Sequence, residues 1–368
     1  MKVAIEAAGF SPTQADNLRR AMGFRRKNST MRRLCLELLE GMGQRGIERS
    51  IAERIVKQLA SFASYGFPES HAASFALLVY ASAFLKRHHA PSFYCALLNS
   101  QPMGFYPVGT VVQDAKRHGV LIRPPDITRS HWDSTLEGDA LRLGLHMIRG
   151  LGATARDQIE SALVQGLTKS IDEFASSSRL SLRQLRALAQ GGAFDALAKS
   201  RRQAQWQVQR YARPLAGPLE ERPSEPQQSL PFMDAAEATA MDYATLGASA
   251  GHHPVELLRP HLRASRIPTF AELHIRSAGP LRVVGLVNSR QRPATASGTV
   301  FLCLEDETGM ANVVVWARLY EENRQTIRDH CLLIIDGTLE RSQGTLNIIA
   351  RHIRPLPSVV RSESHDFH

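Results

Sequence analysis

The spacing of apolar residues changes once along this chain, and the change limits the domains that it can form. Up to about residue 200, apolar residues recur at every third or fourth position, as in the stripe Ile51, Ile55 and Leu59, which predicts amphipathic helices. From Leu281 onward the period is that of strands. Five prolines within residues 212–241 predict an extended linker between the two regions. The sequence therefore predicts a multidomain chain, mainly α first and all-β last.

The β region consists of five runs rich in β-branched residues, with a helix-like segment between the third and the fourth. The runs are LRVVGLV, TVFLCLE, ANVVVW, CLLIIDGTLE and TLNIIARHI, and the segment is ARLYEENRQTI. This order is the layout of an OB-fold barrel, whose second and third strands commonly bind single-stranded nucleic acid. Candidate contacts are Arg290 and Arg292 in the expected loop after the first strand, and Phe301 on the second. The alternative makes Phe301 and Trp316 core aromatics.

Two helix pairs, each joined by a glycine-bearing turn, are expected within residues 140–200. In the first, Gly150, Leu151 and Gly152 form the turn, with Arg149 and Arg156 beside it. Glycines at such a turn let a phosphate approach the backbone N–H groups and the positive end of the following helix. This pattern predicts a helix-hairpin-helix grip on the DNA backbone, with an ordinary αα-hairpin as the alternative. The second turn, QGGA, lacks the pattern and is interpreted as structural.

The charge of the chain is basic and clustered, which favours a nucleic-acid partner. The net charge is +10 over 368 residues. Residues 19–33 carry seven basic side chains and no acidic one, and residues 142–213 carry twelve Lys and Arg against five Asp and Glu. The four cysteines are far apart in the sequence, and no run of 18 apolar residues occurs. We therefore expect a cytoplasmic protein with no membrane partner.

No residue pattern indicates a catalytic or metal site in this chain. The histidines show neither HExxH nor Cys/His ligand spacing, and there is no phosphate-binding GxxxxGK[ST] loop. The adjacent Glu305, Asp306 and Glu307 invite a metal interpretation, but their place between two strands favours a hairpin turn. We therefore expect no catalytic residues and no cofactor bound by this chain.

A short peptide in the linker is a candidate partner-binding segment. Gln228, Leu230 and Phe232 have the order of a glutamine followed by a leucine and an aromatic residue. Such exposed apolar anchors on an extended strand resemble the peptides that dock into a bacterial sliding clamp. The alternative is an apolar patch without a partner.

Three stretches resemble the alpha subunit of bacterial DNA polymerase III, a C-family polymerase. They are AGFSPTQADNLRRAMGFRR, the run from Tyr65 to Ser100, and the run from Gln291 to Trp316. The motifs YGFPESHA and RQRP resemble its error-prone branch in particular. The resemblance covers essentially the whole chain in the order fingers, tandem helix-hairpin-helix, linker and OB barrel. It implies template-directed synthesis past DNA damage, on a primer-template, with Mg²⁺ and deoxynucleoside triphosphates used by the complete polymerase.

The resemblance also assigns roles to residues of the fingers region. The basic helix near the incoming triphosphate corresponds to Arg19, Arg20, Arg25, Arg26 and Lys27. The fingers segment that faces the nucleotide corresponds to Tyr65, Ser70 and His71, for which helix capping and packing is the alternative. In the error-prone branch, accessory translesion proteins rather than the linker peptide are an alternative route to the clamp.

The family's PHP domain and its palm, which carries the catalytic aspartates, have no counterpart in these residues. We therefore expect the chain to bind DNA but to be inactive alone, and to expose an apolar face. The alternative is a stand-alone, non-catalytic DNA-binding protein. A complete nuclease is disfavoured by the lack of a carboxylate constellation. The expected divisions are fingers at 1–125, hairpins at 126–211, linker at 212–265, OB fold at 266–358 and a tail at 359–368.

Overall fold

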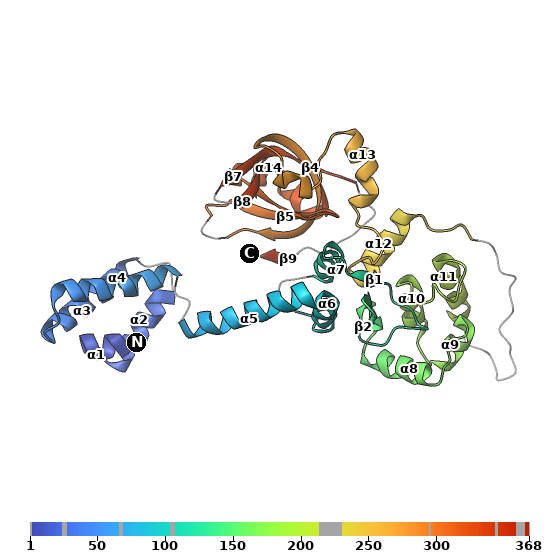
Figure 1. Cartoon of the computed structure of the whole chain (residues 1–368), viewed down its shortest axis with the longest axis horizontal. Helices are drawn as coiled ribbons and strands as arrows, with labels where there is room; N and C mark the ends of the chain where they lie inside the picture. Colours follow the sequence, from blue (N-terminus) through green and yellow to red (C-terminus); the bar gives the residue numbers. More distant parts are fainter. Residues whose placement is uncertain are drawn as a thin grey trace. The chain divides into compact units, whose positions relative to one another are not determined.

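Figure 1 shows a computed structural model of the chain, in which contacts define two compact units, Met1–Phe84 and Leu85–His368. The structure describes residues 2–23, 28–65, 69–103, 107–212, 230–293, 296–342, 345–357 and 365–367. Within these ranges, the side chains at 2, 19–23, 28–31, 60–65, 69–71, 342 and 365–367 lie outside the description. The sequence-based domain boundaries stay a prediction.

The first unit is helical, as predicted. Its elements are α1 (Lys2–Ala8), α2 (Pro12–Gly23), α3 (Asn28–Gln44), α4 (Arg49–Tyr65) and most of α5 (Glu69–His88). Ser11 caps α2, because its hydroxyl accepts the Gln14 N–H at 3.2 Å while the Gln14 side chain accepts the Ser11 N–H at 2.8 Å. A small core of buried apolar side chains, including Leu38 and Met42, holds α1 to α4 together.

Helix α5 carries apolar side chains that are exposed to solvent. Leu77 and Tyr80 are each 74% exposed, and Leu78 is 60% exposed. A helix that is apolar on all sides is normally buried, so this exposure is unusual. The expectation of an exposed apolar face in the fingers region is confirmed for the described side chains.

The hairpin region of the second unit shares one core with the helices before it. Helices α6 (Ala90–Asn99) and α7 (Val108–Arg117) precede a small sheet of β1 (Leu121–Arg123), β2 (Thr135–Glu137) and β3 (Ala140–Arg142). There follow η1 (Leu145–Met147), α8 (Ala153–Val164), α9 (Ile171–Ser177), α10 (Leu182–Gln190), α11 (Arg201–Gln209) and η2 (Arg210–Ala212). The buried rings of Phe174 and Phe194 meet edge to face at the centre of this core, 5.6 Å apart.

Each predicted helix pair is right for one helix only. In the second pair α10 forms, but residues 191–200 after it are turns and bends, and the next helix, α11, begins only at Arg201. In the first pair α8 forms, but the helix expected before the turn does not. Only the single 3₁₀ turn η1 precedes the turn at Gly150. The backbone there is bonded to distant segments, since Leu143 N–H donates to Arg123 O and Leu145 N–H donates to His131 O. These bonds replace the intrahelical ones that the apolar spacing suggested.

The carboxy-terminal part is a closed barrel with the predicted OB order. Strands β4 (Gly279–Gln291), β5 (Val300–Glu305), β6 (Met310–Val315), β8 (Thr345–Pro355) and β7 (Leu332–Ser342) are neighbours in that order around the barrel, because β4 pairs with both β7 and β5. Helix α14 (Ala317–Asp329) lies between β6 and β7 in the chain, and β9 (His365–Phe367) pairs with β4. The fold class is confirmed.

Between the hairpins and the barrel lie α12 (Ala235–Leu246), η3 (Glu256–Leu258), α13 (Arg259–Ala264) and η4 (Ala271–His274). Their apolar side chains pack on the outside of the barrel, where Tyr243 and Leu262 share a core with Val284 and Leu286. This segment therefore links the hairpins and the barrel within the second unit.

Candidate nucleic-acid interface

The turn at the start of α8 has the geometry that the glycine pattern predicts. Gly150 has φ +94°, a conformation that residues with a side chain rarely adopt. Gly152 is the N-cap of α8, and a Cβ built on it meets no atom within 4 Å. The N–H groups of Ala155 and Arg156 both donate to Gly152 O, at 3.0 and 3.1 Å, so the backbone donors at the open end of the helix are those that precede Ala155. Backbone donors and the helix dipole together favour an anion here, which makes this helix end a candidate anion site.

The two arginines of this turn have different surroundings. Arg156 is exposed, bonds Glu160 at 2.9 Å and lies with its guanidinium 6.0 Å from the Trp132 ring centroid. Arg149 is anchored by its own N–H, which donates to Thr245 O at the end of α12 at 2.9 Å. Arg156 is therefore partly neutralised by its neighbour, whereas Arg149 is held against α12.

The second glycine turn packs against the first hairpin. A Cβ on Gly191 would lie 3.0 Å from a side-chain carbon of Ile148, so a larger residue would push the two hairpins apart. Arg201, after this turn, forms ion pairs with Asp195 at 2.9 Å and Asp242 at 2.6 Å. These contacts support the interpretation of the second turn as structural.

In the barrel, the structure places Arg290 on β4, Arg292 directly after β4 and Phe301 on the neighbouring β5, but the three side chains differ in availability. Arg290 donates to Ile327 O at 2.7 Å and to His330 O at 3.2 Å, so it caps the end of α14. Arg292 bonds Glu321 at 2.9 Å and stacks 4.9 Å from the Tyr320 ring centroid. Phe301 is 38% exposed, next to Gln291 across the strands.

Two details of the barrel correct the sequence-based expectations. Asn288 to Gln291 were expected in a loop, but they lie in β4, which continues past a bulge to pair with β5 and close the barrel. The alternative that made Phe301 and Trp316 core aromatics is wrong, because both are exposed, Trp316 by 56%. Both aromatic rings are accessible at the surface for stacking.

The acidic run starts at Glu305, the last residue of β5, and continues with Asp306 and Glu307 into a hairpin turn, as predicted. Asp306 accepts the N–H groups of Thr308 and Gly309 at 2.8 and 3.0 Å, and Arg259 forms ion pairs with Asp306 and Glu307. Within the described ranges, no group of three His, Cys, Asp or Glu side chains is arranged to hold a metal ion. These carboxylates stabilise the turn, and we assign no metal-dependent step to them.

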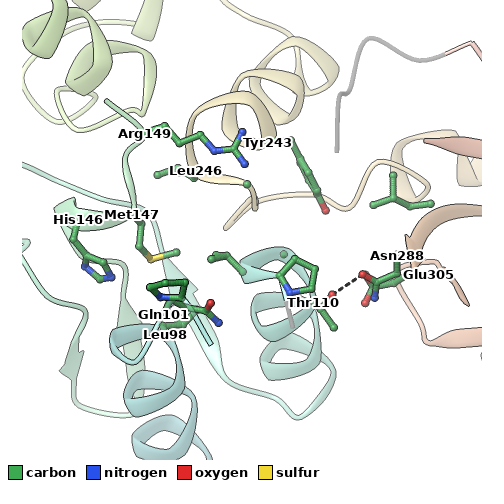
Figure 2. A pocket seen from close by; sticks show the side chains of 16 residues that line it. Leu98, Gln101, Thr110, His146, Met147, Arg149, Tyr243, Leu246, Asn288 and Glu305 are labelled. Atoms are coloured by element: carbon green, nitrogen blue, oxygen red, sulfur yellow. Dashed lines mark hydrogen bonds between the residues drawn. The ribbon is translucent and has the colours of Figure 1, made fainter. Parts of the chain in front are cut away.

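A cavity of about 400 Å³ lies between the first hairpin, α7, α12 and the barrel (Figure 2). Three contacts hold α7 to the segments around the cavity. Thr110 Oγ1 donates to Asn288 Oδ1 at 2.8 Å, Arg117 pairs with the buried Glu305 at 2.7 Å, and Lys116 donates to Gly251 O. Burial raises the pKa of Glu305 to about 7, against the opposing effect of Arg117. Sequence reasoning missed this cavity, because its walls come from five segments that are distant in the sequence.

Most of the nucleotide and partner residues predicted from the sequence are not tested by the structure. Arg25, Arg26, Lys27 and Gln228 lie outside the described residues. The same holds for the side chains of Arg19, Arg20, Tyr65, Ser70 and His71, whose backbones lie in α2, α4 and α5. In the linker peptide, Leu230 is half-buried and Phe232 is 76% exposed.

Three family models match this chain in the order that the sequence suggested. The model described as "Bacterial DNA polymerase III alpha subunit finger domain" matches residues 1–46. "Helix-hairpin-helix motif" matches residues 119–204, and "OB-fold nucleic acid binding domain" matches residues 281–356.

Curated relatives match the chain along all of its length. The error-prone DNA polymerase of Anaeromyxobacter dehalogenans strain 2CP-1 is 46% identical over 387 aligned residues, which cover 100% of this chain and 34% of that protein. The error-prone DNA polymerase of Burkholderia mallei is 44% identical over 384, covering 100% and 35%. The chain is a homologue of the carboxy-terminal part of error-prone DNA polymerases. It spans about a third of the length of these error-prone polymerase relatives.

Among solved structures, one chain of a replication protein A heterotrimer bound to ssDNA is similar over 23% of this chain and 62% of its own length, with 28% identity and a TM-score of 0.19.

Across the part of the chain that the structure describes, no helix is both long enough and apolar enough to cross a bilayer.

Proposed function

We propose that this chain is the part of an error-prone DNA polymerase that grips primer-template DNA. The first hairpin turn holds the duplex backbone, and the barrel holds the single-stranded template. The observation that carries the proposal is the 46% identity to an error-prone polymerase over every residue of the chain. The open N-terminus of α8, with Gly150 and Gly152 in front of it, supports the hairpin's role.

The finer roles belong to the same proposal. The basic residues from Arg19 to Lys27, together with Tyr65, Ser70 and His71, contact the incoming nucleotide in the complete polymerase. That complete enzyme uses Mg²⁺ and deoxynucleoside triphosphates for synthesis past DNA damage. The chain alone binds DNA without extending a primer. The linker peptide ending at Phe232, which is 76% exposed, is the proposed contact with a sliding clamp or an accessory protein.

The test measures DNA binding by fluorescence anisotropy over a salt series, with duplex, single-stranded and primer-template probes. The key variant is Gly152→Asp. An aspartate at the N-cap stabilises α8 as well as glycine does or slightly better, yet its carboxylate occupies the anion site. We expect about tenfold weaker duplex binding at low salt and a salt slope shallower by about one unit.

The matched control is Val164→Asp, which makes the same charge change at the other end of α8, where Val164 is 88% exposed. The two positions are about 18 Å apart along the helix, beyond the screening length of about 10 Å at 0.1 M salt. We expect the control to bind like the wild type. Equal duplex affinity of Gly152→Asp and wild type contradicts the hairpin's role, and no binding of any probe at low salt contradicts the proposed function.

A further inference from the structure

The cavity between the hairpin and the barrel has walls of mixed chemistry. Apolar side chains form most of its surface: Leu98, Pro102, Val108, Met147, Leu246 and Leu286. Polar groups stand among them, as Figure 2 shows for His146, Arg149, Asn288 and Glu305. A volume of about 400 Å³ is within the range of small-ligand sites and is far too small for a duplex.

Arg149 is positioned at this cavity by the end of α12. Its N–H bonds Thr245 O, and its Nη2 lies 3.5 Å from the place where a Cβ on Gly247 would be. Gly247 has φ +75° and ends α12, so its lack of a side chain lets the guanidinium lie over the helix terminus. The negative end of the helix dipole favours a cation there. The arginine is therefore pre-ordered beside the cavity, next to the hairpin turn.

Two polar groups on the walls have hydrogen-bonding capacity that the protein leaves unused. Asn288 accepts the Thr110 hydroxyl through Oδ1, and its amide N–H groups have no partner among the described residues. His146 Nδ1 donates to Trp132 O at 2.8 Å, so Nε2 is a bare acceptor, and this buried atom has no described partner either. A buried polar group without a partner costs about 1–3 kcal/mol. These groups indicate a ligand with both donors and acceptors.

The cavity combines apolar walls, two unused polar groups and an arginine. A flat heterocycle with donors and acceptors on its edge, joined to an anionic group, satisfies all three. The apolar walls match the faces of a nucleobase, Asn288 and His146 match its edge, and Arg149 matches a phosphate. A purely apolar ligand would leave the polar atoms unpaired. We propose that this cavity binds a single nucleotide, with its base between the apolar walls and its phosphate toward Arg149.

The nucleotide has two sources with the same chemistry: an unpaired nucleotide of the template strand as it passes from hairpin to barrel, or a free nucleotide. The strand source rests on the proposed function. The free nucleotide does not, so the two proposals can fail separately.

The test uses the full chain and one fluorophore, 2-aminopurine, which brightens when it leaves a base stack. In the first arm, 2-aminopurine replaces one template base at a time along the single-stranded overhang of a primer-template. In the second arm, the 2-aminopurine deoxynucleoside monophosphate is titrated alone by anisotropy. Total DNA binding is measured in parallel with an end-labelled primer-template.

Three variants accompany both arms. Asn288→Ala removes the amide, and Val108→Trp fills the cavity from α7. The control is Asn347→Ala, which makes the same asparagine-to-alanine substitution on β8, away from the cavity. Circular dichroism and thermal melting check that each is folded. We expect several-fold brightening at one overhang position, or saturable binding of the monophosphate. Asn288→Ala and Val108→Trp should reduce either signal by about tenfold, whereas Asn347→Ala keeps it.

Brightening at one overhang position without monophosphate binding identifies the strand as the source of the nucleotide. Monophosphate binding without brightening in the overhang identifies a free nucleotide. Uniform brightening along the overhang without monophosphate binding, or signals equal in all folded variants, overturns the nucleotide site. If total DNA binding persists in that case, the proposed function stands. If total DNA binding is absent while the monophosphate binds, the proposed function fails and the nucleotide site stands.

Discussion

The buried carboxylate of Glu305 makes the stability of the second unit depend on pH, which tests the interface between α7 and the barrel. Its side chain is 3% exposed and pairs with Arg117 of α7 at 2.7 Å. Burial raises its pKa from 4.5 to about 7. Because the folded state holds the proton more tightly than the unfolded state, Glu305 stabilises the fold below pH 4.5. This stability is lost as the pH rises through 7.

The size of the effect follows from the shift. At about 1.4 kcal/mol per pKa unit, a shift from 4.5 to about 7 corresponds to about 3 kcal/mol of unfolding free energy. Glu305→Gln keeps the shape of the side chain and removes the titration. The unfolding free energy of the wild type minus that of the variant should therefore fall by about 3 kcal/mol between pH 4.5 and pH 8. Other titrating groups cancel in this difference, because both proteins share them.

The assay is urea unfolding followed by tryptophan fluorescence at several pH values. The three tryptophans are Trp132, Trp206 and Trp316, so the signal reports only on Leu85–His368. Glu340→Gln, at an exposed glutamate of β7, is the matched control. A wild-type minus Glu305→Gln difference that stays flat from pH 4 to pH 8 would refute the burial of this carboxylate between α7 and the barrel.

Three further predictions concern separate features. Gly150→Ala, at φ +94°, should destabilise the second unit by about 1–2 kcal/mol, measured by urea unfolding, and weaken duplex binding, measured by anisotropy. An unchanged midpoint of urea unfolding contradicts the left-handed turn. Phe301→Ala, which removes an exposed ring from β5, should weaken single-strand binding by about 1–3 kcal/mol and leave duplex binding unchanged, so equal losses on both probes argue against stacking. Leu78→Lys on α5, where the leucine is 60% exposed, should reduce self-association in analytical ultracentrifugation without loss of helical signal, and a loss of helicity contradicts the exposure.

Local patterns in the sequence predicted those features that depend on neighbouring residues. The alternation of apolar residues after Leu281 identified the barrel strands, because a strand with one buried face requires a period of two. The glycines at 150 and 152 identified the hairpin turn, because a positive φ and an open helix end need residues without side chains. The acidic run at 305–307 was identified as a turn for the same kind of local reason.

The partners of individual side chains could not be derived in this way. Arg290 stays a predicted DNA contact, but no local pattern indicated that it caps α14 through Ile327 O and His330 O, 37 and 40 residues away. The first hairpin helix was expected from its apolar spacing, but bonds to distant segments reduce it to η1. In both cases a tertiary contact competes with the local preference and prevails, because the folded backbone leaves polar groups that must be bonded.

The sequence by itself determined the order of the modules, their helical or β character, the glycine turn at α8 and the basic charge of the chain. Only the tertiary structure decided which arginines are engaged in capping and ion pairs, that α7 is fixed to the barrel through Arg117 and Glu305, and that a cavity forms beside Arg149. The physical reason is the range of the interactions. Periodicity and turn chemistry act over a few residues, whereas the walls of the cavity extend from Leu98 to Glu305 and meet only when the chain is folded.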